Sequence, residues 1–159
     1  MDYFVQGTMP QVFWFRHLLE TGMSFDEAEH FIATTPLAAG MYVIATGPGQ
    51  REGIVYSRSQ GASNANPVYD LRKMTSSNFL VQTNYDRWLA DPVDDPRRTV
   101  AEQQMTAFNQ TDPLTVFATL STFPVTNPET AYTCIMQTSK NSLKAYLRQP
   151  LTLQPSGTY

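Results

Sequence analysis

The chain is poor in the residues from which disulfide frameworks and metal sites are built. Its 159 residues include a single cysteine, Cys134, which excludes an intrachain disulfide and a cysteine-rich zinc site. The two histidines, His17 and His30, lack the HExxH or HxH spacing of metal-binding segments. We therefore expect neither a metal nor another cofactor.

Positive charge and long apolar runs are also scarce. Eleven lysines and arginines against 14 acidic residues leave a net charge of -3, so no excess cation is available to displace counterions from nucleic-acid phosphates. Apolar stretches such as 41–46 are far shorter than the roughly 20 residues of a membrane-spanning helix. The sequence therefore predicts neither a nucleic-acid partner nor a transmembrane protein.

Proline, glycine and serine mark the ends of a first helical hairpin. Pro10 opens a stretch with helical apolar spacing that stops at Gly22. Ser24, with Glu27 three residues later, predicts a capping box at the start of a second helix, which Pro36 ends. We expect two short helices joined by a tight turn.

The rest of the chain alternates strand and helix patterns. Stretches rich in β-branched and aromatic residues predict a four-stranded meander at 41–46, 53–57, 68–71 and 79–83. Two helices and a final strand pair are predicted at 97–109, 114–120, 131–137 and 142–148. This order predicts an α+β domain of antiparallel sheet and helical hairpins over residues 1–148, followed by an extended tail at 149–159.

The densest polar cluster comprises TNYDRW at 83–88 and DDPRRT at 94–99. An asparagine directly after a strand can direct its amide at a developing oxyanion, and an arginine a short loop away can hold a carboxylate or carbonyl in its planar fork. The alternative is an Asx turn at a strand end, with ion pairs at the start of a helix. The residues alone leave both interpretations open.

The string FLVQTNYDRW at 79–88, followed by RRT at 97–99, resembles the C-terminal part of the acid ceramidase and N-acylethanolamine-hydrolysing acid amidase family. The likeness extends over about residues 12–148 and includes LSTFPVTN at 120–127. It implies an N-terminal-nucleophile hydrolase fold, a four-layer αββα sandwich, of which this chain would form one part. By the matching motifs, it also implies catalytic roles for Asn84, on the oxyanion side, and for Arg97.

The resemblance also raises the question of the nucleophile. In that family a cysteine exposed by self-cleavage attacks the amide, and its own α-amine serves as the base. This cysteine lies upstream of the resemblance, so we expect it to be absent from the chain. Cys134 lies within a predicted strand, where a free cysteine is typically a small buried hydrophobic residue. Asp95-Pro96 replaces the Asp-Asp that precedes the arginine pair in the family.

Three functions follow as hypotheses. The favoured one is a non-catalytic, acid ceramidase-like subunit that acts as a structural or accessory component of a larger assembly, where other protein subunits cover an incomplete sheet. The alternative is the C-terminal half of a cysteine amidase that hydrolyses N-acyl amides, ceramide or N-acylethanolamine, with its nucleophile on another chain. The third is a small binding domain whose cleft holds a lipid or acyl amide.

Composition and the N-terminal residues bear on how much of the surface is covered and on the cellular location. Charged residues make up 16% of the chain, against about 25% in typical soluble domains, which suggests that part of the surface is covered by a partner. The resemblance implies a lysosomal location, but the N-terminal residues carry no signal-peptide pattern, which fits an intracellular or organellar assembly equally well. Asn109 begins a glycosylation sequon, which matters only in the secretory pathway.

Overall fold

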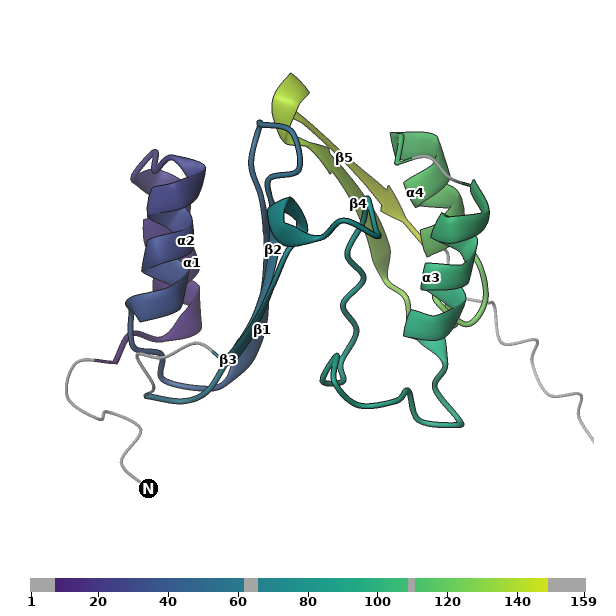
Figure 1. The fold of residues 1–159 in the computed structure, drawn as a ribbon, viewed down its shortest axis with the longest axis horizontal. Coiled ribbons are helices and arrows are strands. Elements are labelled where there is room, and N and C mark those ends of the chain that lie inside the picture. The colour runs from purple at the N-terminus through teal and green to yellow at the C-terminus, as the bar shows by residue number, and fades with distance from the viewer. Residues whose placement is uncertain (1–7, 62–65, 109–110, 149–159) are drawn as a thin grey trace, which may run out of the picture. The chain divides into compact units, whose positions relative to one another are not determined.

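The computed structural model describes residues 8–61, 66–108 and 111–148, which fall into two compact units (Figure 1). The first unit ends at Trp88 and the second begins at Leu89. Each unit combines helices with antiparallel strands, so the predicted α+β class is confirmed. Within these residues, every helix is too short or too polar to cross a bilayer.

The first unit opens with the expected helical hairpin. Between α1 (Gln11–Glu20) and α2 (Phe25–Thr34), Gly22 has a φ of +63°, a left-handed conformation that glycine adopts without a Cβ clash. The capping box of α2 is present: the Ser24 backbone N–H donates to Glu27 Oε2 at 2.8 Å, and the Glu27 N–H donates to Ser24 Oγ at 3.4 Å. Local sequence therefore determines where both helices begin and end.

Three antiparallel strands follow, in the spatial order β1–β2–β3, and a 3-10 turn comes after the last of them. They are β1 (Met41–Thr46), β2 (Gly53–Arg58) and β3 (Asn66–Asp70), and the turn is η1 (Leu71–Lys73). The register pairs Val43 with Tyr56 and Ala45 with Ile54, so these four side chains share one face of the sheet.

That face packs against the helical hairpin and forms the core of the first unit (Figure 1). Its buried members come from both helices, from two of the strands and from the segment between α2 and β1, and they are Trp14, Ile32, Leu37, Val43, Ile54 and Tyr56. Arg58 lies on the same face, is 3% exposed, and donates to the carbonyls of Ile32 and Thr35 at the end of α2. A guanidinium in this position satisfies terminal helix carbonyls and complements the helix dipole.

The predicted fourth strand at 79–83 is wrong, because the sheet of the first unit has three strands and these residues join no ladder in the part of the chain that the structure describes. Strand patterning produces a strand only where a neighbouring edge offers complementary N–H and C=O groups. Here the carbonyls of Val81 and Thr83 instead accept hydrogen bonds from the side chains of Arg87 and Gln82. Residues 79–83 therefore follow an irregular, half-buried path.

The second unit comprises two helices followed by a strand hairpin. Its elements are α3 (Arg97–Phe108), α4 (Pro113–Leu120), β4 (Tyr132–Gln137), the 3-10 turn η2 (Thr138–Lys140) and β5 (Ser142–Leu147). Asp112 caps α4 as predicted: one carboxylate oxygen accepts from the N–H groups of Leu114 and Thr115 at 2.8 and 3.2 Å. The hydrogen bond from the Thr115 hydroxyl is the main cause that lowers the pKa of the Asp112 carboxyl.

The β4–β5 hairpin has two faces of different character. One face packs against α4, where the rings of Phe117 and Tyr146 lie 4.6 Å apart and the Arg148 guanidinium lies 4.9 Å from the centre of the Phe117 ring. The register places six apolar residues on the opposite face: Tyr132, Cys134, Met136, Leu143, Ala145 and Leu147. Four of them are 62–88% exposed. A wholly apolar strand face is typical of the interior of a two-sheet structure.

Candidate functional site

The TNYDRW motif forms a bent loop in the first unit, and its backbone carbonyls are bound by neighbouring side chains. Gln82 Nε2 donates to Thr83 O at 2.8 Å and to Tyr85 O at 2.9 Å, the two carbonyls that flank Asn84. Arg87 Nη1 donates to Val81 O. The loop is therefore held by side chains and not by a strand ladder.

Two side chains of this loop fasten it to the sheet face that turns away from the helices. Tyr42 Oη donates to Asp86 Oδ1 at 2.6 Å, and the Arg87 guanidinium lies 4.7 Å from the centre of the Tyr69 ring. The hydrogen bond to Asp86 raises the pKa of the Tyr42 phenol to about 12, so the phenol stays protonated and able to donate at neutral pH. The loop is thus anchored to β1 and to β3.

Asn84 lies at the bend of this loop and is an exposed residue. Beside it, the Thr83 hydroxyl oxygen is buried and makes no hydrogen bond to any residue that the structure describes. An exposed carboxamide on a constrained turn can donate to an oxygen that gains negative charge. This geometry is compatible with the role predicted for Asn84, and the role itself stays a prediction.

Arg97 begins α3 in the second unit, and the structure describes it and Asn84 each within its own unit. Its Nε and Nη2 donate to the two carboxylate oxygens of Asp95 at 2.6 and 2.7 Å, a bidentate pair. The two side chains are 26% and 21% exposed. One edge of the Arg97 guanidinium is therefore bound by the acid two residues before it.

Arg98 is more buried than Arg97, and it supports the start of α3. Its side chain is 9% exposed, and its Nη2 lies 2.8 Å from Asp91 Oδ1. Asp91 Oδ2 in turn accepts from the Thr99 N–H at 2.7 Å and from the Thr99 hydroxyl at 3.0 Å. Sequence reasoning missed Asp91, because an acid eight residues before the helical threonine matches no capping motif.

The remaining predicted residues do not extend this site. Cys134 lies in β4, partly buried. His17 and His30 are exposed on α1 and α2. The described ranges contain no group of three or more His, Cys, Asp or Glu side chains that could hold a metal ion. Asn109, with its sequon, and the predicted tail at 149–159 lie outside the described residues.

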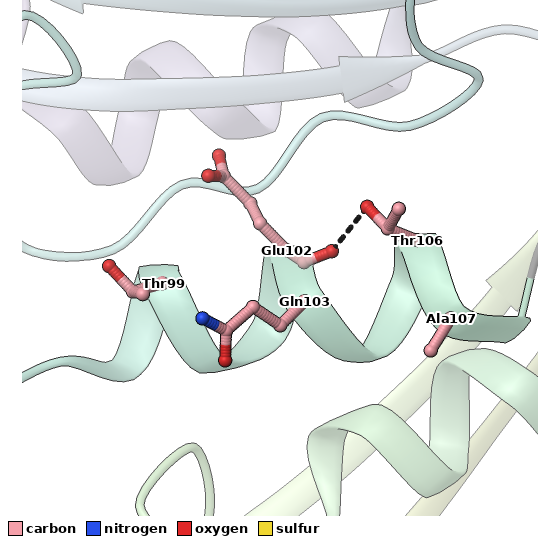
Figure 2. A pocket seen from close by; sticks show the side chains of 5 residues that line it. All are labelled: Thr99, Glu102, Gln103, Thr106 and Ala107. Carbon is pink, nitrogen blue, oxygen red and sulfur yellow. Dashed lines mark hydrogen bonds between the residues drawn. The ribbon is translucent and has the colours of Figure 1, made fainter.

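An open pocket of about 440 Å³, which the sequence did not predict, lies along α3 (Figure 2). Its lining residues come from that helix, and they are Thr99, Glu102, Gln103, Thr106 and Ala107. The Thr106 hydroxyl donates to the Glu102 carbonyl at 2.7 Å. The lining carries two hydroxyl groups, one carboxylate and one carboxamide.

Comparison with known proteins supplies the family. No family model matches the chain. The chain is 36% identical over 135 residues to acid ceramidase of Heterocephalus glaber, a match that covers 84% of this chain and 34% of that protein. It is 35% identical over 136 residues to N-acylethanolamine-hydrolyzing acid amidase of Mus musculus, covering 84% and 37%. The same amidase of Oryctolagus cuniculus is 37% identical over 139 residues, covering 85% and 38%.

By name, these relatives are a ceramidase and an acid amidase that hydrolyses N-acylethanolamine, and the chain is a homologue of both. It belongs to the acid ceramidase and N-acylethanolamine-hydrolysing acid amidase family, which confirms the resemblance drawn from the TNYDRW motif. The chain spans little more than a third of the length of the curated relatives it matches.

Proposed function

We propose that this chain supplies Asn84 and Arg97 to an amidohydrolase that cleaves linear N-acyl amides, ceramide or N-acylethanolamine. Residues 1–148 would form the C-terminal portion of its catalytic domain, with the cysteine nucleophile on polypeptide beyond these 159 residues. The observation that carries the proposal is the exposed position of Asn84 on a turn that neighbouring side chains hold.

The proposed chemistry assigns Asn84 to the carbonyl oxygen. When a cysteine sulfur attacks the amide carbon, the carbonyl oxygen gains negative charge, and the Asn84 amide N–H donates to it. Removing one such donor typically lowers kcat by about 100- to 1,000-fold. The α-amine of the cysteine, with a pKa of roughly 7.7 to 8.0, takes the thiol proton and passes it to the leaving nitrogen. Water then hydrolyses the thioester, which releases the fatty acid and regenerates the thiol.

A non-catalytic accessory role is the second candidate, and the pairing of Arg97 with Asp95 is the observation that favours it. Both oxygens of the Asp95 carboxylate accept from one edge of the Arg97 guanidinium. That edge cannot bind a substrate carbonyl or carboxylate while the pair is intact. An accessory subunit would need this pair only to stabilise the start of α3.

The αββα sandwich belongs to the same proposal. In both units, helices cover one face of an antiparallel sheet. In the second unit the other face is apolar and exposed, with Tyr132, Met136, Leu143 and Leu147 among its members. We propose that a second sheet, whichever polypeptide supplies it, packs on that face at the usual spacing of about 10 Å.

The test combines the chain with a polypeptide that begins with cysteine and corresponds to the rest of a curated relative, and measures fatty-acid release from N-acylethanolamine and from ceramide. We expect release that needs the cysteine and falls at least about 100-fold in Asn84→Ala. Gln103→Ala, which removes an exposed carboxamide from α3, is the matched control and should retain full activity.

Two results would count against the proposal. Full activity in Asn84→Ala would remove Asn84 from the oxyanion site. A stable assembly that contains the cysteine and releases no fatty acid would favour the accessory role.

A further inference from the structure

The carbonyl groups around Asn84 follow an alternating pattern. Val81 O, Thr83 O and Tyr85 O all accept hydrogen bonds from side-chain nitrogen atoms of the same short segment. In a strand, alternate carbonyls point to the same side and are bound by a neighbouring strand, whereas these carbonyls belong to an irregular loop that bends at Asn84. Side chains therefore replace a strand edge along the stretch that carries Asn84.

The hydrogen bonds of Gln82 differ from the contacts of Asp86 and Arg87 because they do not reach the sheet. Asp86 and Arg87 reach Tyr42 and Tyr69, so they anchor the loop to the sheet. The hydrogen bonds of Gln82 end on the loop itself, one residue before Asn84 and one residue after it. A change at Gln82 can therefore alter the turn while both anchors remain.

The chemistry of these contacts determines the orientation of the Gln82 amide. Both partners are backbone carbonyl oxygens, which only accept, so the group facing them has to be the NH2 group with its two hydrogens. One side chain thus uses both of its donors on the carbonyls that flank a single residue.

We propose that Gln82 is a positioning residue for Asn84: its NH2 group clamps the carbonyls of Thr83 and Tyr85 and holds the Asn84 carboxamide in one orientation. The catalytic consequence rests on the function proposed above for Asn84. The clamp itself does not, because it is a property of the loop.

The clamp is tested on the 159-residue chain without any substrate. Gln82→Met keeps the length and the unbranched shape of the side chain and removes both donors. Gln82→Glu replaces the donors by a carboxylate that repels the carbonyl oxygens. The motion of the backbone amides of residues 83–85 is followed by ¹⁵N relaxation, with Gln103→Met as the control.

We expect the order parameters S² of these amides to fall from about 0.85 to below about 0.6 in both variants, while those in β1 and β2 stay near about 0.85. A uniform fall over the whole unit would mean that Gln82 acts only on global stability, and unchanged order parameters would mean that there is no clamp. Either result overturns the proposal.

The second arm uses the reconstituted amidase. Gln82→Met should lower kcat about tenfold or more and leave KM within about twofold, because a misplaced donor affects the transition state and not ground-state binding. Added to Asn84→Ala, it should have no further effect, since both changes remove the same interaction. If the kcat losses of the two single variants multiply in the double variant, Gln82 acts independently of Asn84 and the proposal is overturned.

The two proposals fail in different ways. If the order parameters at 83–85 fall but no assembly hydrolyses amides, the clamp stands and the proposed function fails. If the amidase is active and Gln82→Met is as active as the wild type, the positioning role fails and the proposed function stands.

Discussion

Replacing Tyr42 by phenylalanine tests how the Asn84 loop is anchored to the sheet. The substitution removes the hydroxyl that donates to Asp86 Oδ1 at 2.6 Å and leaves the aromatic ring in place. Because Tyr42 and Asp86 lie 44 positions apart, this contact belongs to the tertiary structure and not to the local conformation of the loop. Its loss should therefore lower the free energy of unfolding of the first unit.

The magnitude follows from the kind of hydrogen bond. A bond to a charged acceptor contributes about 1.5–3 kcal/mol, and partial exposure of both side chains lowers this range, so we expect Tyr42→Phe to cost about 1–2 kcal/mol. With a urea m-value of about 2 kcal/mol/M for a protein of this size, the midpoint should fall by about 0.5–1 M.

The effect should also depend on pH in a defined direction. The pKa of the Tyr42 phenol is raised from 10.0 to about 12 in the folded protein, mainly by its hydrogen bond to Asp86. A raised pKa means that the protonated phenol stabilises the fold fully below pH 10, and that this contribution is lost as the pH rises to about 12. The difference between wild type and Tyr42→Phe should therefore shrink over that interval. Tyr56, whose pKa is also raised to about 12, is present in both proteins, so its pH-dependent contribution cancels in the difference between them.

The assay is urea unfolding followed by tryptophan fluorescence, since Trp14 is fully buried in the core of the first unit. Tyr69→Phe is the matched control: it makes the same chemical change in β3, where the ring and not the hydroxyl contacts Arg87. The control should stay within about 0.5 kcal/mol of the wild type. Equal losses in Tyr42→Phe and Tyr69→Phe, or a difference that persists unchanged above pH 12, would refute the reasoning.

Two further predictions concern packing and capping. Ile32→Ala removes a side chain with 0% exposure from the core of the first unit and should lower the free energy of unfolding by about 2–5 kcal/mol. Leu19→Ala, at a position 81% exposed, should change it by less than about 0.5 kcal/mol. Urea unfolding compares the two variants. Asp112→Ala removes the cap of α4 and should reduce helicity measured by circular dichroism at neutral pH. Because the pKa of Asp112 is lowered in the fold, its stabilisation is lost as pH falls through that value, and the variant should then match the wild type in acid.

The features predicted correctly from the sequence depend on neighbours within a few residues. The capping box joins Ser24 to Glu27, and the Asp112 carboxylate binds the N–H groups of the two residues that follow Pro113. Gly22 ends its helix through its own left-handed conformation. Such short-range interactions are encoded in the order of residue types, so sequence patterns report them directly.

The strand prediction at 79–83 failed for a reason that sequence patterns cannot report. Those residues have strand composition, but a strand also needs a partner edge. The ion pair of Arg97 with Asp95 matches the alternative that the sequence left open, ion pairs at the start of a helix, but the sequence could not show that Asp91 supports Arg98 and Thr99. Side-chain partners of this kind are chosen by the path of the backbone.

By itself, the sequence determines the helix ends, the strand-forming stretches other than 79–83, and the family, through the TNYDRW motif. The tertiary structure alone decides that Tyr42 of β1 binds Asp86, and that side chains and not a neighbouring strand bind the carbonyls of Val81 and Thr83. The physical reason is that every buried backbone carbonyl needs a donor, but only the folded chain determines whether a strand or a side chain supplies it.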